Sequence, residues 1–138
     1  MRFSELVTWK NYQLSFEQIS EPRKSQSALR IFVNGSEDAT DLLIYPASDV
    51  STFQIDFPSY VSYMVTYDDY TLFDVSEVFT GDSFRIFSRS AFIDKQMKQL
   101  QPVKKYTHYS LSCIEHVVDV ISFDEPSIRL LNSKDEQF

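Results

Sequence analysis

The chain has 138 residues and a formal net charge of −7, from 20 acidic and 13 basic side chains. Its hydrophobic share of 43% and charged share of 24% are those of a globular protein and argue against intrinsic disorder. The length predicts a single domain over residues 1–138, with residues 132–138 as a frayed tail. The 12 Phe and 8 Tyr against 2 Gly favour sheets with buried rings and argue against Gly-rich phosphate-binding loops.

The sequence also constrains the cellular compartment. The one cysteine, Cys113, excludes an internal disulfide and a zinc site built from several thiolates. The first ten residues hold no apolar run of the roughly 7 or more residues that a secretory signal needs. No window approaches the roughly 18 consecutive apolar residues of a spanning helix. We therefore expect a cytoplasmic protein that does not enter a membrane.

The charges are distributed unevenly along the chain. Residues 26–80 carry nine acidic side chains and Arg30 as their one base, whereas residues 81–105 carry six basic and two acidic side chains. An acidic middle repels the phosphate backbone, so we expect no nucleic-acid partner. Two interpretations stay open: the two stretches balance each other within the fold or in solvent, or the acidic stretch recruits a basic partner.

The first part of the chain predicts a short helix followed by short strands. Phe3, Leu6 and Val7 can share one face of a helix. Alternating apolar and polar residues predict strands at 12–17 and 29–33, with Asn34-Gly35 as a turn. The polar run 36–41 predicts a loop, followed by a strand over 42–45.

The middle of the chain predicts further strands. Phe53, Ile55 and Phe57 alternate up to Pro58, and residues 60–67 form the clearest strand pattern in the chain. Asp68-Asp69 follows that strand as a turn. Gly81-Asp82 predicts another turn, between the apolar pair at 78–79 and a strand at 84–87.

The last part predicts one helix and two more strands. Residues 90–100 fit a helix that Ser90 caps and Pro102 ends. We expect strands at 106–112 and 117–122 around a turn at 113–116, although residues 114–121 also fit a helical stripe. About seven short strands with one or two helices give an α+β domain with a mainly antiparallel sheet; a β-sandwich or open barrel is the alternative.

Cys113, His108 and His116 are the candidates for metal binding or nucleophilic catalysis. A zinc site needs about four ligands, so Glu115 or Asp119 would have to complete it. On a strand, His108 and Cys113 point to opposite faces, which does not favour a shared site. We expect a buried cysteine, structural histidines, no metal and no cofactor. A hydrolase or small-ligand site that uses His108, Cys113 and His116 is the alternative.

The acidic pair Asp68-Asp69 lacks the context of a known carboxylate site. Adjacent strand residues point to opposite faces, whereas paired catalytic carboxylates face each other across a cleft. Phe73 stands where a calcium loop beginning at Asp68 would need glycine. We expect a solvated turn at this position.

Tyrosines lie on both sides of this pair. Tyr63 and Tyr67 precede Asp68 and Asp69, and Tyr70 follows them. Tyrosine is enriched at binding interfaces because it offers a large rigid contact with a polar tip; these residues equally fit a half-buried sheet surface. With no catalytic motif in the chain, we expect a small non-enzymatic binding protein of the inhibitor or immunity type. Its acidic, tyrosine-bearing surface would engage a basic protein partner. The sequence leaves the oligomeric state open.

Overall fold

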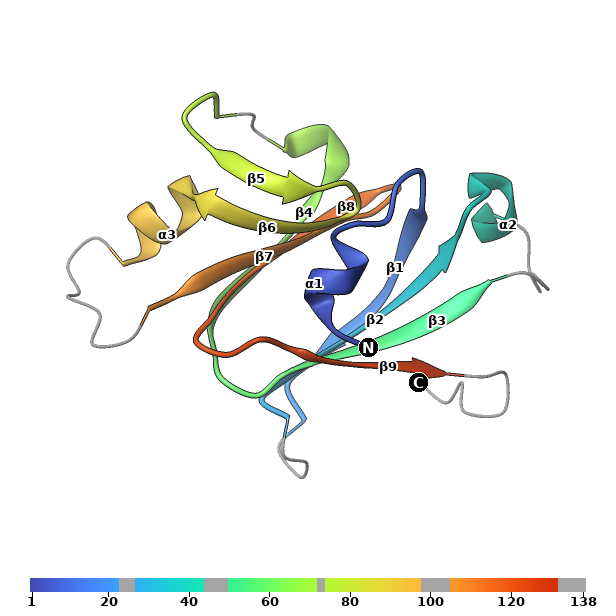
Figure 1. The fold of residues 1–138 in the computed structure, drawn as a ribbon, viewed down its shortest axis with the longest axis horizontal. Coiled ribbons are helices and arrows are strands. Elements are labelled where there is room, and N and C mark those ends of the chain that lie inside the picture. Colours follow the sequence, from blue (N-terminus) through green and yellow to red (C-terminus); the bar gives the residue numbers. More distant parts are fainter. Residues whose placement is uncertain (23–26, 44–49, 72–73, 98–104, 132–138) are drawn as a thin grey trace.

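Two antiparallel sheets make up most of the part of the chain that the computed structural model describes, residues 1–22, 27–43, 50–71, 74–97 and 105–131 (Figure 1). The strands are β1 (Gln13–Ser20), β2 (Leu29–Ser36), β3 (Ser51–Phe57), β4 (Tyr60–Tyr67), β5 (Val78–Gly81), β6 (Phe84–Arg89), β7 (Thr107–Ser112), β8 (His116–Ser122) and β9 (Ser127–Leu131). The helices are α1 (Phe3–Leu6), α2 (Ala39–Leu43) and α3 (Ala91–Gln96), with a single 3-10 turn η1 (Asp68–Tyr70).

The sheets share two continuous stretches of chain. The strand orders are β1-β2-β3-β9 and β4-β8-β7-β6-β5. β3 continues into β4 across Pro58 and Ser59, and β8 continues into β9. The β3–β4 stretch therefore pairs with the β8–β9 stretch in both sheets: β3 with β9 in one, and β4 with β8 in the other. Ser59 ties the two corners together: its carbonyl accepts from the Phe123 N–H at 3.2 Å and its hydroxyl donates to Asp124 at 2.8 Å. The sheets do not close into a barrel, so β1, β9, β4 and β5 are edge strands.

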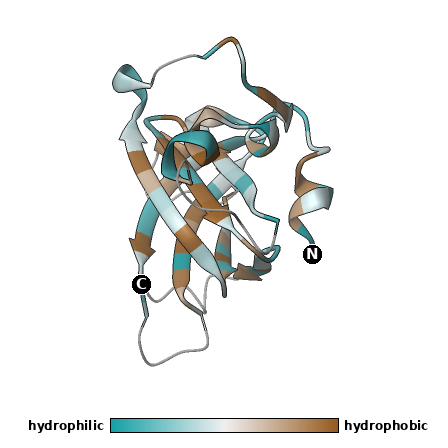
Figure 2. Ribbon diagram, turned by 90° about the vertical axis from the view of Figure 1, so that its left-hand side faces the viewer, coloured by the Kyte–Doolittle hydropathy of each residue, from teal (hydrophilic) through white to brown (hydrophobic). Residues whose placement is uncertain are grey.

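The core lies between the inner faces of the two sheets. Figure 2 shows hydrophobic and hydrophilic residues alternating along strands, the pattern of a strand with one face toward a core. α1 adds Phe3 and Leu6, which are 0% and 1% exposed. The Phe3 ring lies edge-on to Phe84 and Tyr109 of the five-stranded sheet, at 5.7 and 5.1 Å. A four-residue helix has little intrinsic stability, so this packing accounts for its presence.

The sequence correctly predicts a mainly antiparallel, sheet-rich α+β fold, but nine strands are described rather than about seven. β9 was not expected: it is short, and Leu131 is its one fully buried residue. Residues 116–122 form strand β8, not the alternative helix. Residues 132–138, expected to be frayed, and 98–104, where the predicted helix was expected to end, lie outside the described residues.

Two local predictions between residues 34 and 45 are wrong. Asn34 and Gly35 lie inside β2 rather than in a turn. The glycine at position 35 leaves room for the Tyr12 ring, which an added side chain would meet. Leu42 and Leu43 belong to α2 rather than a strand, because the Asp38 carboxylate accepts from the Thr40 N–H at 2.9 Å and starts a helical turn. Residues 44–45 lie outside the described part.

The turn at Gly81 is as predicted. Gly81 adopts φ +114°, a backbone conformation that residues with a side chain rarely adopt, and it connects β5 to β6.

Candidate functional site

Strand β4 carries the first of the predicted binding residues along an edge of the five-stranded sheet. Among the described strands it pairs with β8 alone, and none of its eight residues is fully buried. Tyr67 lies opposite His116, and their rings are 5.0 Å apart. The Tyr63 ring packs against the core and its hydroxyl donates to Glu21 at 3.2 Å. The structure therefore places Tyr67 on the open surface and Tyr63 at the seam between the two sheets.

The acidic turn follows β4 directly. The Asp68 N–H donates to the Glu115 carbonyl at 2.8 Å, and the Asp68 carbonyl accepts from Thr71 at 3.1 Å. These bonds fix the backbone of η1, while the side chains of Asp68, Asp69 and Tyr70 point into solvent. Tyr70 is 78% exposed. The structure thus brings Tyr67, Asp68, Asp69 and Tyr70 to one end of the sheet.

Residues 74–79, beyond the turn, also combine acidic with exposed hydrophobic side chains. The Asp74 carboxylate accepts from the N–H and the hydroxyl of Ser76, at 2.9 and 2.6 Å, and these bonds lower the pKa of Asp74. Val75 is 86% exposed, and Val78 and Phe79 are exposed on β5. Seven of the ten large hydrophobic side chains that are exposed in the described residues lie between 64 and 79: Met64, Val65, Tyr67, Tyr70, Val75, Val78 and Phe79. They do not form one patch, because β4 and β5 are the opposite edges of the five-stranded sheet. We call the exposed group at the end of β4 and in η1, namely Tyr67, Asp68, Asp69 and Tyr70, the acidic–apolar surface.

The acids of this surface are not neutralised within the described residues. The ion pairs found there join Arg2 to Glu125 at 2.7 Å, Arg30 to Asp56 at 2.8 Å, and His108 to Asp119 at 2.7 Å. None connects the acidic stretch 26–80 with the basic stretch 81–105. Arg85 of the basic stretch instead lies 4.4 Å above the Phe79 ring, and burial lowers its pKa.

His108 is the centre of a buried polar cluster beneath α3. It is 2% exposed; its Nδ1 lies 2.7 Å from the Ser90 hydroxyl and its Nε2 lies 2.7 Å from the Asp119 carboxylate. The Phe87 ring stacks on the imidazole at 4.0 Å. Ser90 also caps α3, since its hydroxyl oxygen accepts from the Ile93 N–H at 3.0 Å.

The hydrogen bonds of this cluster suit an imidazole that carries a proton on Nε2 and donates it to the Asp119 carboxylate. Nδ1 forms the second bond, with the Ser90 hydroxyl. The Ser90 oxygen then keeps a lone pair for Ile93. Every one of these buried polar groups has a partner, and the cluster ties α3 to the sheet.

The three candidate residues for a His/Cys site are not brought together. Cys113 follows the end of β7 and lies five residues after His108, roughly 16 Å away at strand rise. The Cys113 thiol is buried in the core, and this burial raises its pKa to about 12. The Cys113 N–H donates to the His116 carbonyl at 2.8 Å, but the His116 ring packs against Phe16 and Tyr67. No group of three or more His, Cys, Asp or Glu side chains in the described ranges could hold a metal ion.

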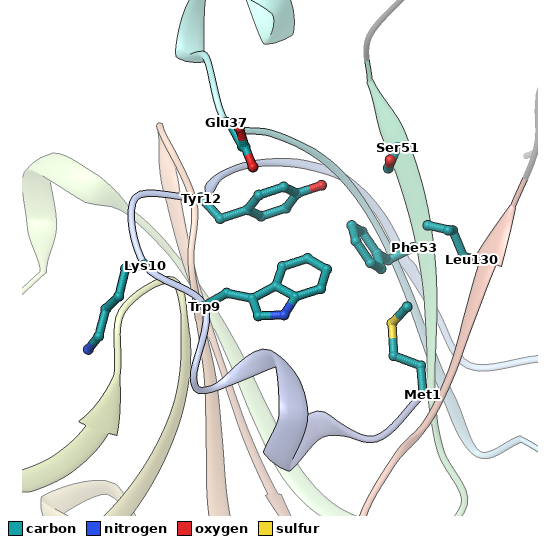
Figure 3. Close-up of a pocket in the computed structure, with 8 residues that line it drawn as sticks. All are labelled: Met1, Trp9, Lys10, Tyr12, Glu37, Ser51, Phe53 and Leu130. Carbon is teal, nitrogen blue, oxygen red and sulfur yellow. The ribbon is translucent and has the colours of Figure 1, made fainter.

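An aromatic pocket on the four-stranded sheet was not predicted from the sequence (Figure 3). It has a volume of about 440 Å³, and its lining includes Trp9, Tyr12, Phe53 and Glu37. The rings of Trp9 and Tyr12 meet edge-to-face at 4.9 Å, and each lies near 6 Å from Phe53. Burial is the main cause that raises the pKa of Tyr12. The spacing of Trp9 and Tyr12, together with a glycine in β2 that accommodates Tyr12, is the signal that could have indicated this pocket.

Comparisons of the chain with protein-family models, with curated proteins and with solved structures each find no match. Across the helices that the structure describes, none combines the length and the apolar character needed to cross a bilayer.

Proposed function

We propose that this protein is a non-enzymatic binding module, of the inhibitor or immunity type, that engages a basic protein partner through its acidic–apolar surface. The observation that carries the proposal is the exposure of Tyr67 and Tyr70 beside Asp68 and Asp69, two acids that have no ion-pair partner in the described chain. Exposed apolar groups next to unpaired charge are typical of an interaction site.

The two kinds of side chain have separate roles in such binding. Tyr67 and Tyr70 offer rigid contact area that loses little conformational entropy when it is covered. Asp68 and Asp69 attract a basic partner and orient its approach. The Tyr63 hydroxyl is already bonded to Glu21, so we assign Tyr63 a supporting role under this surface.

The test is capture from a lysate of the host, at low and at high salt, with the wild-type protein and the double variant Asp68→Lys/Asp69→Lys as baits. We expect a basic protein that wild type retains at low salt and that the double variant loses. The double variant changes the net charge from −7 to −3, so the control Glu5→Lys/Asp94→Lys makes the same change at exposed sites elsewhere. Equal retention by all three proteins would contradict the proposal.

A second candidate function, small-ligand binding, is favoured by the aromatic pocket rather than by a His/Cys site. The pocket combines an aromatic wall with the Tyr12 hydroxyl, Ser51 and the Glu37 carboxylate. Trp9 is the only tryptophan in the chain, so its fluorescence reports on this pocket alone. A set of small aromatic amines and carboxylic acids, titrated against the protein, should shift the Trp9 emission if the pocket binds ligands, and Phe53→Leu should weaken that response.

A further inference from the structure

The backbone hydrogen bonds of β4 leave one side of the strand free. In an antiparallel pair, residues that bond to the neighbouring strand alternate with residues whose N–H and C=O groups point away from it. Asp68 donates its N–H to Glu115 on the β8 side, and the same register places Thr66 opposite Val117. Val65 and Tyr67, the alternate residues, therefore direct their N–H and C=O groups away from β8.

These outward groups have no partner strand in the described chain, because β4 is the last strand of its sheet. No described backbone group other than those of β8 bonds to β4 between Ser62 and Tyr67. An edge of this kind is a template on which another extended chain can pair.

The other three edges carry features that hinder such pairing. β1 has a bulge between Phe16 and Gln18, next to the exposed Glu17. β5 has four residues and begins with a bulge, and β9 has five residues with the exposed Arg129 at its centre. Bulges, short length and charged side chains are the usual ways to protect an edge.

β4 lacks these features over most of its length. Its bulge lies at the start, between Tyr60 and Ser62, and the residues from Ser62 to Tyr67 include no charge and no proline. β-branched and aromatic residues dominate this stretch, and Met64, Val65 and Tyr67 are exposed. The acidic pair Asp68-Asp69 follows directly at its end.

We propose that an extended, basic segment of a protein partner binds by adding a strand to the free edge of β4. This inference rests on the proposed function and specifies how the partner docks. Main-chain bonds to Val65 and Tyr67 would supply affinity, and lysine or arginine near the end of the added strand would meet Asp68 and Asp69. A second copy of this chain fits the edge less well, since each copy carries a net charge of −7.

The test uses a displayed library of random 12-residue peptides as the probe and Val65→Pro as the central variant. Proline removes the outward N–H of Val65, and the ladder to β8 does not use that N–H. Val65→Thr is the matched control because it keeps the N–H and the β-branched shape. We expect the selected peptides to be rich in lysine or arginine. They should bind Val65→Pro at least about tenfold more weakly than wild type or Val65→Thr, because the proline removes one to two main-chain hydrogen bonds and blocks the added strand sterically.

Amide hydrogen exchange in the wild-type protein gives a second readout that needs no variant. The amides of Val65 and Tyr67 should exchange rapidly in the free protein and become protected when a selected peptide is added. The amide of Thr66, directed toward β8, should be protected in both states.

The outcomes separate this inference from the proposed function. Peptides that lose affinity for Asp68→Lys/Asp69→Lys but bind Val65→Pro as tightly as wild type would overturn strand addition and leave the acidic–apolar surface as the binding site. Basic peptides that are insensitive to both variants would overturn both ideas. A free protein that sediments as a dimer, with Val65 already protected and with Val65→Pro monomeric, would show that a second copy covers the edge.

Discussion

Two polar regions of the same five-stranded sheet are built in opposite ways. Under α3, His108 and the groups around it are buried, and each polar atom of the cluster has a hydrogen-bond partner. At the end of β4, Asp68 and Asp69 are exposed and no described base pairs with them. A residue whose polar groups all form hydrogen bonds inside the fold contributes to stability. A residue whose polar groups form no bond within the fold is available to a partner.

Residue type alone does not show which of the two regions is available to a partner. Histidine and cysteine are the residues most often associated with chemistry, yet here His108 holds a helix on the sheet and Cys113 fills the core. The aspartates and tyrosines at the end of β4, which equally fit an ordinary solvated surface, carry the polar groups that the described fold does not use. Substitutions in the two regions should therefore separate stability from binding.

The largest expected effect is the loss of stability in His108→Ala. The substitution removes the ring that stacks on Phe87 and leaves the Asp119 carboxylate, 13% exposed, without its partner. We expect the free energy of unfolding to fall by about 3 kcal/mol or more, from a cavity and an unpaired acid that is mostly shielded from solvent. Urea unfolding followed by circular dichroism measures this change.

The chain's other histidine provides the matched control. His116 is partly exposed and makes ring contacts but no side-chain hydrogen bond within the described residues. We expect His116→Ala to cost less than about 1 kcal/mol. Equal effects at the two positions would break the distinction between a buried network and a surface ring.

Ser90→Ala should give the next largest loss of stability. It removes the cap of α3 and also leaves the Nδ1 of His108 without its hydrogen-bond partner. The two effects together predict a loss of about 2 kcal/mol. Ser90→Thr keeps the hydroxyl and should retain most of the stability. If Thr fails as badly as Ala in the same unfolding measurement, the hydroxyl is not what matters at this position.

The sequence predicted the fold best where hydrophobic period and turn chemistry agree. Strand β4 was predicted with its observed bounds, because Tyr60–Tyr67 alternates between two clear turn signals. The prediction failed at Gly35, where Asn-Gly favours a turn locally but pairing with both β1 and β3 continues the strand. Tertiary contacts of this kind cannot be read from neighbouring residues alone.

The candidate surface was predictable only in part. The number of acids in residues 26–80 indicated a charged surface. Tyr67, Asp68, Asp69 and Tyr70 do lie together, at the exposed end of β4. The sequence could not show that Tyr63 turns to Glu21, because Glu21 lies 42 residues away. Nor could it show that β4 is an edge strand, since strand order depends on long-range pairing.

The pH dependence of the unfolding free energy tests the burial of Cys113. Burial favours the neutral thiol and raises its pKa from 9.0 to about 12, so the thiol contributes stability below about pH 9. This contribution should be lost as the pH rises from about 9 to about 12, because unfolding then releases a proton. The difference in unfolding free energy between wild type and Cys113→Ala, measured across this range, isolates the thiol.

Alkylation gives an independent check on the same group. Cys113 is the only cysteine, so iodoacetamide labels one position. At pH 8 the folded protein should react far more slowly than the protein in urea, since the thiolate is the nucleophile and the thiol is buried. Rapid labelling of the folded protein would place Cys113 at an accessible, activated site instead.

The double variant Asp68→Lys/Asp69→Lys should have the smallest effect on stability and the largest effect on binding. Asp68 and Asp69 are exposed, and the hydrogen bonds of Asp68 in η1 come from its backbone, which Asp68→Lys/Asp69→Lys retains. We expect the free energy of unfolding to change by no more than about 0.5 kcal/mol, as is usual for exposed turn positions. Association with a basic partner should slow mainly at low salt, because exposed charges act on the encounter rate and are screened within about 8–10 Å at physiological ionic strength. Stopped-flow association at two salt concentrations, beside urea unfolding of the same samples, measures both quantities. A double variant that unfolds easily would mean that these acids belong with His108 as structural groups, and the contrast between the two regions would fail.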